Sequence, residues 1–362
     1  MVKATFPTKQ ANTRIAIVGE APGALEETEG RPFVGASGQE LTRCLATAGI
    51  EREACLLTNV FEERPPGNNL REWTLGERDF KQYLKEWPDP ISRDRAAGMP
   101  RIGPSMRLKP DFIGALDRLY EELNKYAPTM IIALGNTALW ALCEATGINK
   151  HRGTVTTSTM YPAKVIPTYH PAAVLREWGL RPILIADLIK AKKESEFPEI
   201  RTRHRELWLD PTLEDLWNFY DKYIDPCSLL SVDIETARFE HITCIGYAPS
   251  PDLALVIPHV DRRKPGYHYW SEKEEIEAWN FHRHVLSRKD MPYKILGQNF
   301  TYDFQYLHLH GVPVRNYLAD TMLHHHALFP ELPKSLGFMG SIYSNEISWK
   351  SMRQKKANKR EE

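Results

Sequence analysis

Side chains able to act on a bound ligand stand at regular places in the first half of the sequence. Glu20, Asn59 and His170 each lie at or just after the end of a short apolar run, and Phe33 lies between the glycines of G-R-P-F-V-G. A carboxylate can activate water, an amide offers a donor and an acceptor, and an imidazole can donate to developing negative charge. An aromatic ring adds a flat surface for stacking. Together these side chains predict a ligand site on one rim of a sheet.

A second group of polar side chains lies in the other half of the sequence. Asp233 and Glu235 are two residues apart in V-D-I-E-T, so in a strand their side chains share one face. Asp303 follows in G-Q-N-F-T-Y-D. Neighbouring carboxylates repel each other, and a hard divalent cation such as Mg²⁺ or Mn²⁺ removes that repulsion. The trio therefore predicts a metal site suited to phosphodiester hydrolysis.

The elements that position the first group alternate between strands and helices. Apolar runs predict strands at 14–18, 56–60, 129–134 and 164–168, and helical spacing predicts helices at 37–48, 112–126, 137–146 and 180–193. This alternation is typical of a parallel sheet covered on both faces. The carboxyl ends of parallel strands form the ligand crevice, so Glu20, Asn59 and His170 should share one rim.

The elements of the second half follow a different pattern. Strands are expected at 229–234, 242–248, 253–257 and 293–296, the first three as a meander, with helices at 271–286 and 301–310. The charged stretch between the halves predicts a linker at 196–208. We therefore expect domains at 1–195, with a long insertion at 64–111, and at 209–348, followed by a disordered basic tail at 349–362.

Composition excludes several classes of protein. Lys+Arg and Asp+Glu both number 47, so net charge gives no sign of a nucleic-acid partner. No apolar run reaches the roughly 20 residues that span a bilayer, and no apolar signal core precedes the first strand. The five cysteines are scattered without a C-x-x-C pair, which favours reduced thiols in a cytoplasm.

Five segments in order resemble the uracil-DNA glycosylase superfamily, most closely its family 4 branch. They are G-E-A-P-G at 19–23, G-R-P-F-V-G-A-S-G at 30–38, T-N-V at 58–60, R-P-P-G-N at 64–68 and H-P-A-A-V-L-R at 170–176. The resemblance implies a three-layer α/β/α domain that flips a base out of DNA and cleaves its glycosidic bond.

The resemblance also implies a role for each site residue. Phe33 would stack on the flipped uracil, with Ala21 beside it, and Asn59 would bond the pyrimidine edge. His170 would donate to the uracil O2, and Glu20 would orient the attacking water. The expected DNA-contacting residues are Pro171, Val174, Leu175 and Arg176, the last three as a wedge that fills the gap left by the base.

Two departures from the family pattern stand out. Family 4 members carry four cysteines for a 4Fe–4S cluster, whereas here Glu62 and Glu63 precede R-P-P-G and no cysteine pair lies near the N-terminus. No iron–sulfur cluster is therefore expected. The family's His-Pro-Ser is His170-Pro171-Ala172 here, which removes one hydroxyl contact to DNA.

The second half resembles the 3′–5′ exonuclease domain of family A DNA polymerases, with a ribonuclease-H-like mixed α/β fold. Asp233 and Glu235 match its first motif as metal ligands, and Asp303 belongs to its second. The implied substrate-binding residues are Thr236, Asn299 and Tyr302. The third motif, which supplies the last aspartate, is absent, so the domain is expected to be truncated and to hold its metal weakly. The run His324–His326 is expected at the surface or close to DNA rather than on a metal.

The domain pair leaves several functions open. The first is a DNA repair and replication enzyme that excises uracil, in a bacterial or phage-infected cell. The second is a non-catalytic DNA-binding accessory. The third is the front fragment of a split polymerase whose exonuclease is completed by another chain. DNA is the expected partner in each reading, a polymerase fragment is expected in the third, and no membrane is involved in any.

Overall fold

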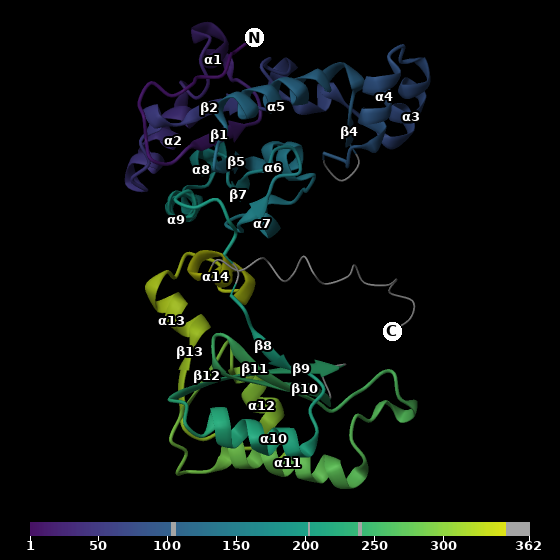
Figure 1. Cartoon of the computed structure of the whole chain (residues 1–362), viewed down its shortest axis with the longest axis vertical. Helices are drawn as coiled ribbons and strands as arrows, with labels where there is room; N and C mark the ends of the chain where they lie inside the picture. The colour runs from purple at the N-terminus through teal and green to yellow at the C-terminus, as the bar shows by residue number, and fades with distance from the viewer. Residues whose placement is uncertain (103–105, 202, 238–240, 345–362) are drawn as a thin grey trace. The chain divides into compact units, whose positions relative to one another are not determined.

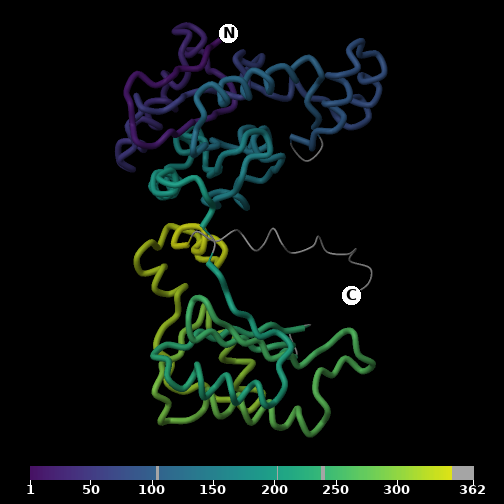
Figure 2. Tube along the Cα trace, viewed as in Figure 1, coloured from purple at the N-terminus to yellow at the C-terminus, as the bar shows by residue number. Residues whose placement is uncertain are grey.

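The computed structural model describes residues 1–102, 106–201, 203–237 and 241–344. Contacts along the chain form two compact units (Figures 1 and 2). Unit 1 is Met1–Arg201 together with the stretch from Gly337 onward, and unit 2 is Thr202–Leu336. The chain therefore leaves unit 1 once and returns to it. Among the described residues, no helix has both the length and the apolar character needed to cross a membrane.

The sheet of unit 1 runs in the order β2-β1-β5-β7-β6. Its strands are β1 Ile15–Gly19, β2 Leu56–Asn59, β5 Met130–Leu134, β6 Thr156–Thr157 and β7 Lys164–Thr168. All pair in parallel except β6, which runs antiparallel to β7. Every residue of β1, β5 and β7 is buried, as expected for strands covered on both faces.

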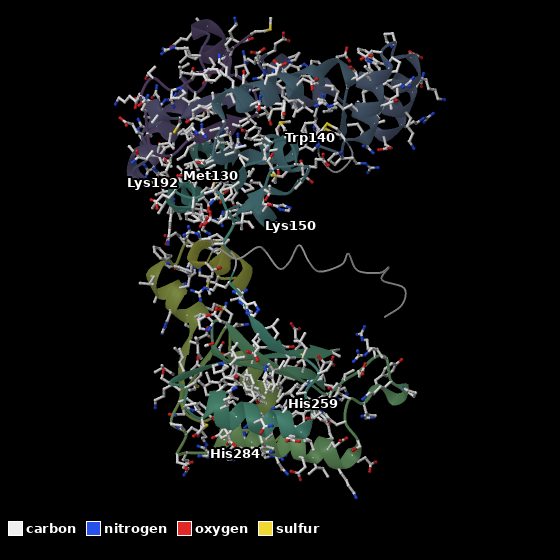
Figure 3. The ribbon with its side chains drawn as sticks, in the orientation of Figure 1. Met130, Trp140, Lys150, Lys192, His259 and His284 are labelled. Carbon is white, nitrogen blue, oxygen red and sulfur yellow. The ribbon has the colours of Figure 1, made fainter. Side chains whose placement is uncertain are left out.

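Helices cover both faces of this sheet (Figure 1). Their bounds are α1 Ala24–Glu29, α2 Ala36–Thr47, α5 Gly114–Tyr126, α6 Gly135–Cys143, α7 Ile148–His151, α8 Pro171–Arg176 and α9 Arg181–Glu194. Alternate strand residues pack with α5 and α6 on one side and with α2, α8 and α9 on the other. Trp140 and Met130, labelled in Figure 3, belong to these two cores. The predicted α/β fold class is confirmed.

The described residues of the insertion at 64–111 form a small subdomain. It contains β3 Thr74–Gly76, α3 Glu77–Glu86, α4 Pro90–Gly98 and β4 Met106–Leu108, with β3 and β4 antiparallel. Trp73 stacks on Phe112 with ring centroids 4.6 Å apart and meets Phe61 edge-on at 5.0 Å. Aromatic packing of this kind anchors the insertion to the core of unit 1.

Unit 2 is built on a mixed sheet in the order β13-β12-β9-β10-β11-β8. Its elements are β8 Glu206–Trp208, α10 Leu213–Phe219, β9 Leu229–Ala237, β10 His241–Ser250, β11 Leu253–Pro258, α11 Glu272–Ser287, β12 Lys294–Gly297, α12 Thr301–Leu309, β13 Tyr317–Asp320 and α13 Thr321–Leu328. The predicted meander β9-β10-β11 is present and antiparallel. Its core includes the fully buried Tyr247, Phe281 and Tyr293.

The division into units differs from the sequence prediction in one place. The boundary after Arg201 falls inside the expected linker at 196–208. Residues 337–344 were expected inside the second domain at 209–348, yet they belong to unit 1, and most of them form α14, Leu336–Tyr343. The expected basic tail at 349–362 lies outside the described residues.

Candidate active site

Two of the predicted pocket residues, Asn59 and Phe33, meet at the carboxyl end of β1. Gly19 pairs with Asn59 in the parallel register of β1 and β2. A Cβ atom built on Gly19 would lie 2.4 Å from Asn59 Oδ1 and 2.8 Å from Phe33 Cζ. The amide and the ring therefore both lie against the Gly19 backbone, where only a residue without a side chain leaves them room.

The loop that carries Phe33 is held in an uncommon conformation. Phe33 has a φ of 56° and is buried. A Cβ atom on Gly38 would lie 1.9 Å from the Phe33 carbonyl oxygen, so α2 approaches the loop as closely as a glycine allows. Arg52 Nη2 donates to the same carbonyl oxygen at 2.9 Å. These contacts fix the ring beside Asn59.

His170 is placed at the N-terminus of α8, directly after β7. Its Nδ1 accepts a hydrogen bond from Ala172 N at 3.2 Å. Burial, with a smaller contribution from the Arg176 charge, lowers the pKa of His170 to about 4. The ring is therefore neutral near pH 7, and because Nδ1 is an acceptor its proton must sit on Nε2. Its centroid lies 6.4 Å from that of Phe33.

Glu20 follows Gly19 and is half-buried at the same strand end. The Thr137 hydroxyl of α6 donates a hydrogen bond to Glu20 Oε2. Ala21 next to it packs partly against the core. A helix on the neighbouring βα unit thus orients the carboxylate, whose second oxygen is left for another partner.

Glu26 is a site residue that the sequence analysis missed. Its side chain is buried, and Oε1 accepts a hydrogen bond from Gly35 N at 2.9 Å. A Cβ atom on Gly23 would lie 2.7 Å from Glu26 Oε2, so both glycine loops close around this carboxylate. Its charge also acts on His170, raising the pKa of the imidazole slightly against the effect of burial. The sequence did contain a signal for Glu26, because this acidic residue lies between the glycine turns G-E-A-P-G and G-R-P-F-V-G.

The predicted DNA wedge on α8 needs a correction. Val174 is fully buried in the core shared with α2 and α9, so its side chain cannot reach DNA. Pro171 is also buried, at the first turn of the helix. Leu175 is 47% exposed and Arg176 is exposed, so these two remain available. Trp178, which the sequence analysis did not single out, is 62% exposed just beyond them.

The carboxylates of unit 2 lie partly together. Asp303 Oδ1 accepts a hydrogen bond from Ile234 N at 2.9 Å, which brings α12 against β9. Burial, followed by the nearby Asp233 and Asp320 charges, raises the pKa of Asp303 to about 7. Burial and the charge of Glu235 likewise raise the pKa of Asp233. The two strand carboxylates and Asp303 therefore share one electrostatic environment.

The residues expected to bind an exonuclease substrate flank these carboxylates. The hydroxyls of Thr236 and Tyr302 are 2.6 Å apart. Asn299 has a φ of 55°, and its N–H donates to Asp320 Oδ1 at 3.0 Å. The second oxygen of Asp320 accepts from Phe300 N at 2.8 Å. These bonds fix the turn that precedes α12.

Across the described ranges, no group of three or more His, Cys, Asp or Glu side chains is arranged so that it could hold a metal ion. Among the described residues, the trio Asp233, Glu235 and Asp303 is therefore not arranged as a complete site for Mg²⁺ or Mn²⁺. Of the run His324–His326, the outer two histidines are exposed as expected. His325 is buried against Phe329, which corrects the expectation for that residue.

Comparison with known proteins agrees with the geometry of unit 1. Residues 6–192 match the family model "Uracil DNA glycosylase superfamily". The type-4 uracil-DNA glycosylase of Thermotoga maritima is 34% identical over 185 residues, which are 50% of this chain and 77% of that protein. The type-4 enzymes of Pyrobaculum aerophilum and Archaeoglobus fulgidus are 32% and 33% identical, and the match covers 46% of this chain in each case and 70% and 69% of those proteins.

A likeness to a solved structure is much weaker. The structure of Brucella melitensis NrnC with bound Mg²⁺ is 13% identical, with a TM-score of 0.25, over 39% of this chain and 61% of that one. The family model matches residues within unit 1, where Phe33, Asn59 and His170 lie close together. The chain belongs to the uracil DNA glycosylase superfamily.

Proposed function

We propose that unit 1 excises uracil from DNA by hydrolysis of the N-glycosidic bond, as a cytoplasmic DNA repair protein. The observation that carries this proposal is the meeting of Asn59 and Phe33 over the bare backbone of Gly19, with His170 nearby. A flat ring inserted there would lie along Phe33 while its hydrogen-bonding edge faces the Asn59 amide. The type-4 relatives carry the same activity in their names.

The protonation state of His170 supports its role toward the leaving base. Since Nδ1 accepts from Ala172 N and the pKa is about 4, Nε2–H is a neutral donor at pH 7. In this proposal it donates to the uracil O2, where negative charge grows as the bond to C1′ breaks. Glu20, held by Thr137, orients the water that attacks C1′. Leu175 and Arg176 contact the DNA from which the base has left.

A labelled oligonucleotide with a single uracil tests the proposal. The full chain should convert it to an alkali-labile abasic product, and a matched thymine oligonucleotide should remain intact. Glu20→Ala, His170→Ala and Asn59→Ala should each slow this conversion on the order of 10²-fold or more. Glu177→Ala, at an exposed position on the same loop, should not. Equal binding of both oligonucleotides with no cleavage would favour the accessory reading instead.

A second candidate function concerns unit 2. It is supported by the cluster of Asp233 and Asp303, whose pKa values are both raised, beside the hydroxyls of Thr236 and Tyr302. We propose that this face binds DNA 3′ ends and becomes a 3′–5′ exonuclease when a polymerase-like polypeptide completes it with Mg²⁺ or Mn²⁺. Trimming of DNA 3′ ends by this chain alone would contradict the proposal that a second polypeptide is needed to complete the site.

A further inference from the structure

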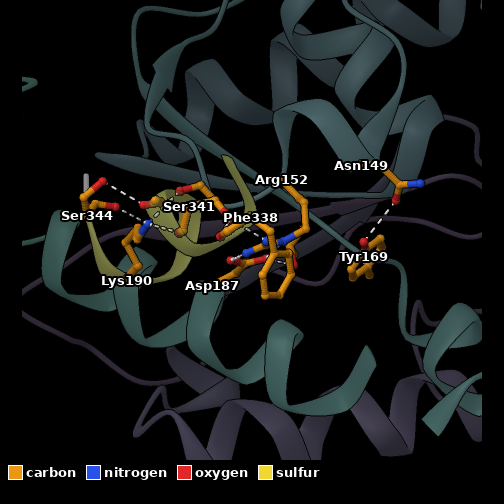
Figure 4. Close-up of polar contacts among 11 residues, drawn as sticks. Asn149, Arg152, Tyr169, Asp187, Lys190, Phe338, Ser341 and Ser344 are labelled. Carbon is orange, nitrogen blue, oxygen red and sulfur yellow. Dashed lines mark hydrogen bonds and ion pairs between the residues drawn. The ribbon is translucent and has the colours of Figure 1, made fainter. Parts of the chain in front are cut away.

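A buried polar cluster lies in unit 1 away from the candidate pocket (Figure 4). Arg152, Asp187 and Lys190 are each at most 9% exposed, and we call them the polar socket. Arg152 Nε donates to Asp187 Oδ2 at 3.0 Å, and the other carboxylate oxygen accepts from Arg152 Nη2. Charged groups this deeply buried persist only where their hydrogen bonds are satisfied.

The polar socket holds residues 337–344, which we call the C-terminal segment. Arg152 Nη1 donates to Ser341 Oγ at 2.7 Å, and the guanidinium carbon lies 5.4 Å from the centroid of the Phe338 ring. Lys190 Nζ donates to the carbonyl oxygens of Ser341, of Ser344 at 2.7 Å and of Gly153 at 2.9 Å. Figure 4 shows these bonds converging from α9 and α14.

The three acceptors match the three N–H bonds of a lysine ammonium. Burial lowers the pKa of Lys190 to about 8, so the group is still charged at pH 7. Two of its three acceptors belong to the C-terminal segment. Release of the segment would therefore remove most of the partners of a buried charge. This segment lies outside the residues 6–192 that match the family model.

The same socket is joined to β7, the strand that precedes His170. Thr168 Oγ1, in the last residue of β7, donates to Asp187 Oδ2 at 2.7 Å. Gly153 N donates to the Pro167 carbonyl oxygen at 2.9 Å. Gly153 has a φ of 70°, and a Cβ atom there would lie 2.7 Å from Asp187 Oδ1 and 3.0 Å from the Ser341 carbonyl oxygen. The segment, the socket and the end of β7 thus pack without spare room.

We infer that the C-terminal segment is a positioning element for His170, which it holds through the polar socket and β7, so that uracil excision depends on residues that follow unit 2. Arg152, Asp187 and Lys190 are positioning residues, since none of them lies at the pocket. The inference rests on the proposed function for its activity readout. Its physical basis is that catalytic groups tolerate little displacement from the productive geometry.

The test uses the full chain and two readouts. Lys190→Met removes the donor that binds the segment, and the double variant Phe338→Ala/Ser341→Ala alters only the segment, so every residue of Met1–Arg201 is unchanged. Both should raise amide hydrogen exchange over 337–344 and over 166–173. Both should slow single-turnover uracil excision by roughly 10- to 100-fold while the Kd for uracil-containing DNA is unchanged. Lys193→Met, an exposed lysine on the same helix, is the matched control.

The outcomes separate this inference from the proposed function. Faster exchange of the segment with an unchanged excision rate, or equal rates for Lys190→Met and Lys193→Met, would overturn it. If the unmodified chain excises no uracil, the proposed function fails, and exchange alone decides. Loss of protection over 166–173 in the double variant then supports the coupling, whereas protection equal to that of the unmodified chain refutes it.

Discussion

Placing one methyl group on Gly19 should close the candidate pocket without unfolding the protein. In Gly19→Ala the new Cβ would lie 2.4 Å from Asn59 Oδ1, so the amide must retreat by about 1 Å to reach ordinary contact at 3.4 Å. Phe33 Cζ, at 2.8 Å, must also move. A displacement of about 1 Å at reacting groups costs on the order of 10²-fold in rate. We therefore expect excision to fall by about that factor.

The assay is single-turnover excision from an oligonucleotide with one uracil, followed by alkaline cleavage. Gly114→Ala is the matched control, because a Cβ there meets nothing within 4 Å. It should retain full activity. Thermal unfolding of both variants separates closure of the pocket from loss of fold. If Gly19→Ala retained an excision rate equal to that of Gly114→Ala, Asn59 and Phe33 would not form the base pocket, and the assignment would be wrong.

Three further predictions concern α8, His170 and unit 2. Val174→Ala should lower stability by about 2 kcal/mol in thermal unfolding, because it removes buried methyl groups, whereas Leu175→Ala should weaken uracil-DNA binding without changing Tm. The pKa of His170 is about 4 when folded and 6.5 otherwise, so the unfolded chain binds more protons between these values. The contribution of His170 to the free energy of unfolding is therefore fully present above pH 6.5 and falls by up to roughly 3 kcal/mol toward pH 4. Urea titrations at different pH values should show a smaller fall in the free energy of unfolding for His170→Asn. Tyr247→Phe should cost unit 2 roughly 1–3 kcal/mol in urea unfolding, because it leaves His282 Nδ1 buried without its 2.7 Å partner.

Much of unit 1 could be predicted from the sequence because its signals are local. Short apolar runs predicted β1, β2, β5 and β7 to within one or two residues, and glycines marked the turns after β1 and β5. A parallel sheet then places every strand end at one edge, so residues far apart in sequence were expected together. Asn59 and Phe33 do meet at Gly19.

Other features depend on contacts that no local pattern encodes. Helical spacing could not tell which side of a one-and-a-half-turn helix faces the core, and therefore Val174 was assigned to DNA although it is buried. Glu26 lies between two glycine turns in the sequence, but its burial and its contacts with both loops are set by the fold. The positive φ of Phe33 results from the close approach of Gly38 and not from any preference of phenylalanine.

The sequence by itself determined the family, the positions of the motifs at strand ends and the kinds of side chain at the sheet edge. These features follow from residue identity and short-range periodicity. Tertiary structure alone decided the tautomer and low pKa of His170, which depend on burial and on Ala172 N. It also decided that the chain returns to unit 1 after residue 336 and satisfies Arg152 and Lys190 there. A buried charge requires hydrogen-bond partners, and the folded chain can supply them from residues that are distant in the sequence.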